Sequence, residues 1–184
     1  RRRSRQSRVE GLAVEGERLG FNPPEAIVRN PELLMRIFEE SARLKVPLSS
    51  EASRLVGEFR HLVTRAYRQS PAVIRSFERI LESPAAPFNV LNEMLRCGFL
   101  ERFVPPFSQI VNRIQYDEYH LYPVDKHSLR VVQTIKRLDT PDDTFGDPLC
   151  AQVLEELRDK HLLYWAALLH DVGKGSTVSG HAEQ

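Results

Sequence analysis

Apolar residues recur every three or four positions along most of the chain after residue 30, with polar residues between them. This spacing is typical of helices with one buried face. Serine and asparagine favour the position before a first turn, proline favours its first residue, and glycine favours the residue after a helix. The pattern predicts four helices: one starting at Asn30-Pro31 and ending near Pro47, one from Ser49 or Ser50, one from Ser70-Pro71, and one from Asn89 to Cys97, closed by Gly98.

The inner faces of the first three helices follow from the same spacing. The residues expected there are Leu33, Leu34, Ile37, Phe38, Leu44, Leu55, Val56, Phe59, Leu62, Val63, Ile74, Phe77, Ile80 and Leu81.

The beginning of the chain has a different pattern. Residues 8–21 alternate weakly between apolar and polar side chains, with glycine at 11, 16 and 20, which predicts a short β-hairpin. Pro105-Pro106 marks a boundary further along. We therefore expect an all-α helical bundle with a short N-terminal β-hairpin, divided into a hairpin and helical linker region (residues 1–104) and a second region (residues 105–184).

Two helices are predicted in the second region. One starts near Asp125, a candidate N-cap, and has His127 in its first turn and an apolar face of Leu129, Val132, Ile135 and Leu138. The other contains eight consecutive apolar or aromatic residues, 162–169, followed directly by His170 and Asp171. Because a helix that is hydrophobic all round is usually buried, its C-terminal end is expected to be buried too.

The His170-Asp171 pair admits two interpretations. A histidine and an acid at a helix end can be a dipole partner and a surface charge. Buried charges, however, need partners or a metal, and imidazole and carboxylate together suit divalent ions. We predict metal ligation by His127, His170 and Asp171, with His181 as a further ligand. The ion expected is Mn²⁺ or Mg²⁺, with Zn²⁺ and Fe²⁺ as alternatives.

A catalytic role is predicted for two residues at this site. Lys174 lies between two glycines, so its ammonium group can reach a phosphate bound in the same cavity. Asp171 is expected to act both as a ligand and in catalysis. The chemistry that follows from such a site is metal-assisted hydrolysis of a phosphoester.

Composition indicates which partners and which cellular compartment to expect for this site. The 184 residues are 41% hydrophobic and 28% charged, and the formal net charge of +1 argues neither for nor against nucleic acid; we expect no nucleic-acid partner. No apolar run reaches the roughly 18–20 residues of a membrane span, so no membrane partner is expected either. Cys97 and Cys150 are far apart in sequence and fit reduced thiols in a cytoplasmic protein. The basic run at residues 1–8 and the acidic loop at 139–147 are interpreted as a solvated tail and as turn residues.

The sequence also resembles a known family. The stretch from Phe107 to Arg130, which includes His120, and the stretch Ala166-Ala-Leu-Leu-His-Asp-Val-Gly-Lys-Gly with His181 after it are similar to the HD superfamily of metal-dependent phosphohydrolases. They resemble in particular the bacterial PII uridylyltransferase/uridylyl-removing enzymes. Softer matches to the linker and short strand segment of those enzymes lie at residues 8–19, 31–38 and 59–63.

This resemblance implies an HD-domain-like helical bundle that removes the uridylyl group from a tyrosine of the PII signal protein and releases UMP. It implies that Asp171 can bridge two metals, and His120 is expected to support the site rather than to bind the ion. The family's Gly-Ser and paired-Asp nucleotidyltransferase signature and its ACT domains are not found in the 184 residues. We therefore expect a middle piece of such an enzyme, inactive in isolation, with the last aspartate ligand of the HD domain outside the chain.

Three functions stay open at this point: the hydrolase part of a uridylyl-removing enzyme, another HD phosphohydrolase acting on nucleotides, and a non-catalytic helical scaffold that links domains. An incomplete helical core would expose apolar surface, so association with a second copy of the chain is a further hypothesis.

Overall fold

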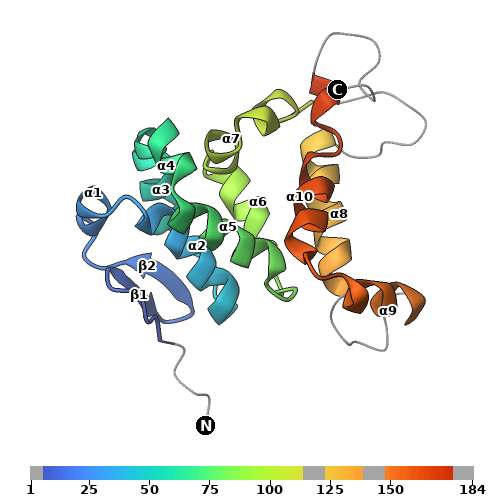
Figure 1. Cartoon of the computed structure of the whole chain (residues 1–184). Coiled ribbons are helices and arrows are strands. Elements are labelled where there is room, and N and C mark those ends of the chain that lie inside the picture. The colour runs from blue at the N-terminus through green and yellow to red at the C-terminus, as the bar shows by residue number, and fades with distance from the viewer. Residues whose placement is uncertain (1–5, 114–122, 139–147, 176–184) are drawn as a thin grey trace. The chain divides into compact units, whose positions relative to one another are not determined.

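The computed structural model describes residues 6–113, 123–138 and 148–175. The chain forms two compact units, residues 1–103 and residues 104–184, which are described separately below (Figure 1). The predictions for His120, His181 and the acidic loop at 139–147 fall on residues outside the described ranges.

The first unit begins with the predicted hairpin. Strands β1 (Leu12–Glu15) and β2 (Arg18–Phe21) pair antiparallel. The tight turn between them contains Gly16 at φ +61°, a left-handed conformation that glycine adopts without steric cost. The backbone of Leu19, which is fully buried, also forms hydrogen bonds with the backbone of Pro47 and Ser49. These bonds anchor the hairpin to the segment that leads into the helix beginning at Ser50.

Helices make up the rest of this unit (Figure 1). They are α1 (Ala26–Arg29), α2 (Leu33–Leu44), α3 (Ser50–Phe59), the 3₁₀ turn η1 (Arg60–Leu62), α4 (Arg65–Gln69), α5 (Pro71–Glu82), α6 (Val90–Arg96) and α7 (Leu100–Phe103).

The predicted helix boundaries are confirmed where local chemistry sets them. The Ser49 hydroxyl accepts a hydrogen bond from the Ala52 amide (3.0 Å), and the Asn89 side chain accepts from two amides of the first turn of α6. Pro71 is the first residue of α5, and Gly98 follows α6 at φ +68°. The Ser49 and Asn89 side chains satisfy amides that the first turn of a helix leaves without a helical partner.

An aromatic cluster fills the core of the first unit. Phe99 lies at its centre, with its ring centroid 5.3 Å from that of Phe38, 6.5 Å from Tyr67 and 6.1 Å from Phe103. The ring of Phe77 lies 5.0 Å from that of Phe103. All five side chains are buried, and aromatic pairs at these separations stabilise a core beyond the area that they bury.

Some expectations for the inner faces were wrong in detail. Phe77, Ile80 and Leu81 of α5 are buried as expected, but in its first turn Val73 is buried and Ile74 is only half-buried. Helix α3, the second of the predicted helices, ends at Phe59, and Leu62 lies half-buried in η1. The prediction also missed α1, α4 and α7.

The second unit contains η2 (Pro105–Gln109), α8 (Val124–Leu138), α9 (Pro148–Glu156), α10 (Lys160–Leu169) and η3 (Val172–Gly175). Helices α8 and α10 pack side by side (Figure 1), and η2 packs against η3. The start of α8 meets the end of α10, as the contact between His127 and His170 shows, so the two helices are antiparallel. The described part of the chain is mostly helical with one small sheet, as predicted. Within the described residues, no helix is both long and apolar enough to cross a membrane.

Candidate metal centre

His127 lies in the first turn of α8, as predicted. Its amide donates a hydrogen bond to the carbonyl of Pro123 (2.9 Å), and the Val124 amide donates to the carbonyl of Arg113 (3.0 Å). These two bonds satisfy amides of the first turn of the helix. They fix the backbone from which the His127 imidazole projects.

Asp125 does not have the predicted N-cap position. It lies inside the first turn of α8, is 1% exposed, and accepts a hydrogen bond from the Asn112 amide through Oδ2 (3.2 Å). Asn112 has φ +56°, a left-handed conformation that asparagine tolerates better than most residues. Asp125 therefore anchors the segment before α8 to the helix, a role that sequence spacing did not reveal.

His170 and Asp171 follow the last turn of α10. The Nδ1 atom of His170 lies 2.8 Å from the Ala167 carbonyl oxygen, which can only accept, so Nδ1 carries the proton in this bond. Nε2 of the neutral ring is then the atom with a free lone pair. This Nε2 lies 3.3 Å from Oδ2 of Asp171, so the lone pair and the carboxylate are neighbours.

Three of the predicted ligands come together. His127 Nε2 lies 3.8 Å from Oδ2 of Asp171, the two imidazole centroids are 5.4 Å apart, and one ligand atom from each of the three residues lies within 4.8 Å of the others. The Asp171 side chain is 8% exposed, whereas those of His127 and His170 are 35% and 38% exposed. The carboxylate thus lies at the base of the cluster, and the imidazoles form its open side.

Lys174 also reaches this cluster. Its ammonium nitrogen lies 3.0 Å from Oδ1 and 3.1 Å from Oδ2 of Asp171, and its amide donates to the Asp171 carbonyl (3.0 Å) within η3. The Lys174 side chain is only 9% exposed. Lys174 therefore contacts the carboxylate directly, whereas its position between two glycines predicted only a phosphate as its partner.

The surroundings of the pair differ from expectation. Helix α10 is not buried all round, because Leu162 is 59% exposed and Ala166 is exposed. Leu149, Val153 and Leu157 add exposed apolar side chains at four-residue spacing in and just after α9. Burial on α10 is therefore confined to one side of the helix, where Tyr164, Ala167 and Leu168 are buried.

The cluster fits one divalent ion chemically. Metal–ligand distances of about 2.0–2.2 Å for imidazole and carboxylate mean that two atoms sharing an ion lie at most about 4.2–4.4 Å apart. The 3.3 and 3.8 Å separations from Asp171 fall within this limit, whereas the bound of 4.8 Å on all three pairs exceeds it slightly, so the two imidazoles would have to approach each other by a few tenths of an ångström to share an ion. Two imidazoles and a carboxylate leave coordination positions open on the exposed side, which is the pattern of catalytic rather than structural sites.

Comparisons with known proteins agree with this division of the chain. Residues 13–103 match the model of the uridylyltransferase GlnD third domain, and residues 124–183 match the HD domain. A bifunctional uridylyltransferase/uridylyl-removing enzyme of Novosphingobium aromaticivorans is 32% identical over 94% of the chain. Enzymes of the same name from Nitrosospira multiformis and Methylococcus capsulatus are 37% and 38% identical over 92% and 67% of it.

The chain belongs to the uridylyltransferase/uridylyl-removing enzyme family. It spans 19% of the length of the Novosphingobium and Nitrosospira relatives and 14% of that of Methylococcus. Its first unit corresponds to the family's third domain, and its second unit contains the HD match with all three clustered residues. No solved structure matches the chain.

Proposed function

We propose that the second unit contributes the metal site of a phosphodiester hydrolase that removes the uridylyl group from uridylylated PII protein and releases UMP. The observation that carries this proposal is the convergence of His127, His170 and Asp171 inside the HD match. The names of the relatives, which include uridylyl removal, support the reaction type.

Each residue of the cluster has a distinct task in this proposal. His127 and His170 offer neutral nitrogens, and the bond from His170 Nδ1 to the Ala167 carbonyl holds that ring in the tautomer that binds a cation. Asp171 supplies the negative charge. These three residues would hold a divalent ion, which when bound would supply Lewis acidity and lower the pKa of a bound water to near neutral.

Lys174 adds a second positive charge beside the same carboxylate. A phosphodiester gathers negative charge on its oxygens as it is hydrolysed, and a fixed cation next to the site stabilises that charge. We assign Lys174 this role, with Asp171 holding its ammonium group in position. His181 is retained as a proposed further ligand on sequence grounds alone.

The proposal is tested in the full-length protein that contains this chain. Purified enzyme is assayed for bound Mn²⁺ and for release of UMP from uridylylated PII, beside the variants His170→Ala and Asp171→Ala. The expected result is that both variants lose metal and UMP release while uridylyl transfer to PII persists. His61→Ala, an exposed histidine of the first unit, is the matched control and should change neither measurement.

Two other results would favour the alternatives. Metal-dependent hydrolysis of free nucleotides without release of UMP from PII would indicate another HD phosphohydrolase. A wild-type protein that binds no metal and releases no UMP would indicate a scaffold in which the cluster is only an ion-pair network.

A further inference from the structure

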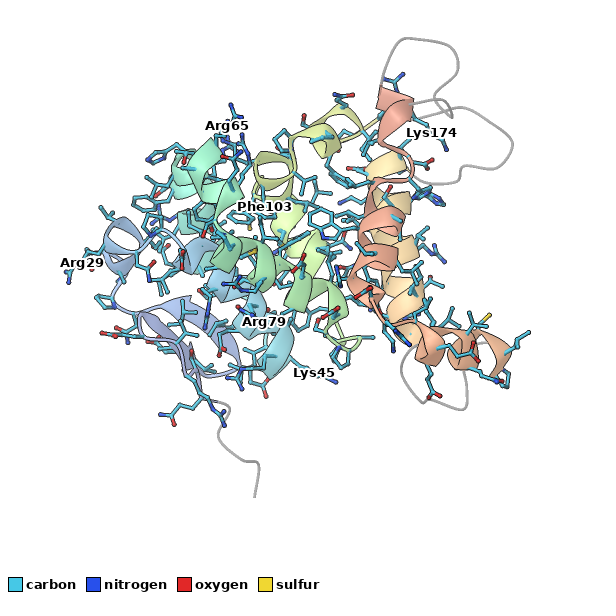
Figure 2. All side chains as sticks on the ribbon, viewed as in Figure 1. Arg29, Lys45, Arg65, Arg79, Phe103 and Lys174 are labelled. Atoms are coloured by element: carbon cyan, nitrogen blue, oxygen red, sulfur yellow. The ribbon has the colours of Figure 1, made fainter. Side chains whose placement is uncertain are left out.

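A polar pocket lies in the first unit, away from the HD cluster in sequence and in a different unit. It has a volume of about 240 Å³ and is formed where α2 packs against α5. Its lining residues are Glu32, Arg36, Ala72, Val73, Arg75, Ser76 and Arg79. Figure 2 labels Arg79, which projects from α5.

One arginine of the pocket, Arg79, is paired with a carboxylate through two of its nitrogen atoms. Arg79 Nε lies 2.5 Å from Oε1 of Glu39, and Arg79 Nη2 lies 3.4 Å from Oε2. The Ser76 hydroxyl donates to the same Oε2 (2.8 Å). Burial alone would raise the Glu39 pKa, but the hydrogen bonds from Arg79 and Ser76 and the charges of Arg36 and Arg79 outweigh it and lower that pKa. Glu39 is therefore an ionised carboxylate whose oxygens are already engaged.

The other two arginines retain hydrogen-bonding capacity. The Nε atom of Arg36 lies 3.4 Å from Oε2 of Glu39, which is close enough for an ion pair. This Nε atom is buried, yet it makes no hydrogen bond in the described structure. Arg75 is exposed and lies four residues before Arg79, so the two like charges share one face of α5. Each guanidinium has five N–H donors, and most of those on Arg36 and Arg75 point to no protein acceptor that the structure describes.

The lining of the pocket carries more positive than negative side chains. Three arginines and one carboxylate, that of Glu32, line it, while the Glu39 and Glu78 carboxylates act on Arg79 from outside the lining. Glu32 accepts a hydrogen bond from the Ser70 hydroxyl (3.3 Å), so part of its acceptor capacity is used. Guanidinium groups with free donors bind phosphate through paired, charge-assisted hydrogen bonds.

We propose that this pocket binds one small phosphate-bearing anion, with Arg36 and Arg75 as its principal contacts. The volume fits a single small molecule, and the Glu32 carboxylate in the lining disfavours an extended polyanion such as nucleic acid. The ligand is either free inorganic phosphate or the phosphate group of a mononucleotide, which share the same recognition chemistry. The site is independent of the proposed hydrolase function.

The test measures binding by isothermal titration calorimetry at constant ionic strength. The whole chain with His170→Ala and Lys174→Gln is used without added metal, so that both the metal ligand and the cation proposed to contact phosphate in the HD cluster are removed. Inorganic phosphate and AMP are the two probes. We expect saturable one-to-one binding of at least one probe, weakened at least about tenfold by Arg75→Gln. Tighter binding of AMP than of phosphate identifies a mononucleotide, and equal binding identifies the phosphate group alone as the recognised feature.

Two controls keep the result specific. Arg65→Gln removes an exposed arginine elsewhere in the first unit and should leave binding unchanged (Figure 2). Arg75→Lys keeps the charge but loses the paired donors, so an intermediate loss is expected. Because Arg75 is exposed, its variants should fold even if Arg36→Gln does not. Absence of binding, or equal losses for Arg75→Gln and Arg65→Gln, would overturn the proposal.

Discussion

The ammonium nitrogen of Lys174 lies 3.0 Å from one carboxylate oxygen of Asp171 and 3.1 Å from the other. Asp171 is also the acid that both histidines of the cluster approach. A divalent ion on Asp171 must therefore share that carboxylate with a lysine whose side chain is almost buried. The same contact that positions Lys174 for a phosphate is expected to weaken the binding of metal.

This relationship predicts opposite effects on binding and on turnover. Lys174→Gln should tighten Mn²⁺ binding by roughly tenfold, because a nearby like charge is removed, and should slow UMP release by about a hundredfold or more. Electron paramagnetic resonance titration of free Mn²⁺ measures the first effect without any assay of activity. Lys126→Gln, which removes an exposed lysine of α8, is the control. Weaker metal binding in Lys174→Gln would show instead that the lysine orients Asp171 for the ion.

Asp125 provides a prediction about the support of the site. Asp125→Ala should lower the free energy of unfolding of the second unit by about 1–3 kcal/mol, because the Asn112 amide loses its acceptor. Asp125→Asn keeps an oxygen at that place and should restore most of the loss. Trp165 in α10 is the only tryptophan of the chain, so its fluorescence during urea unfolding reports on this unit.

The control for this comparison is Asp159→Ala, since Asp159 is exposed and its side chain makes no capping hydrogen bond to α10. Equal damage from Asp125→Ala and Asp125→Asn would mean that the negative charge, and not the hydrogen bond, is what the segment before α8 requires.

Features that depend on neighbouring residues in sequence were predictable. Ser49, Asn89 and Gly98 end or begin helices through bonds and dihedral angles within one turn, so the sequence was enough to place them. The hairpin followed from alternation and glycine spacing. The short helices were missed because four or five residues are too few for a helical period, and such helices depend on tertiary packing.

The site shows the same distinction. His127, His170 and Asp171 were selected by residue type and by resemblance to the HD superfamily, and the structure brings them together. The bond from Asp125 to Asn112 joins residues on either side of a loop, so local spacing did not reveal it. The exposure of Leu162 also depends on how far neighbouring helices cover α10, which an apolar run alone does not specify.

Lys136 leads to a prediction about pH. It lies on the inner side of α8 with 6% of its surface exposed, and burial lowers its pKa from 10.5 to about 8. Between these values the unfolded chain binds more protons than the folded chain, so this lysine makes the second unit more stable as pH rises from 8 to 10.5. At pH 7, below both pKa values, the buried lysine is charged in the folded and the unfolded chain, so the full desolvation penalty lowers the free energy of unfolding. Lys136→Met should therefore stabilise the unit at pH 7 by about 1–3 kcal/mol, and the gain should shrink towards pH 10.5.

Urea unfolding followed through Trp165 at several pH values measures this difference, with Lys126→Met on the same helix as an exposed control. A gain of the same size at pH 7 and pH 10.5 would attribute it to packing by the methionine and would contradict the desolvation argument.

Glu39 gives the opposite dependence on pH in the first unit. Its pKa is lowered in the folded chain, because hydrogen bonds from Arg79 and Ser76 outweigh the effect of burial. The carboxylate therefore stabilises the fold above the ordinary pKa of 4.5 and loses this effect as pH falls through the lowered value. Glu39→Gln should destabilise the unit by about 1–2 kcal/mol at pH 7, since Arg79 loses its charged partner.

Hydrogen exchange of the amides of α2 and α5 measures this loss locally, because the two helices pack against each other through this network. The difference between wild type and Glu39→Gln should narrow as pH falls through the lowered pKa of Glu39, because the wild-type carboxylate then also becomes neutral. Glu51→Gln is the matched control: Glu51 forms an ion pair with Arg54 on the exposed face of α3, and such pairs contribute little. Equal loss of protection in both variants would mean that Glu39 stabilises α2 and α5 no more than a solvent-exposed ion pair does.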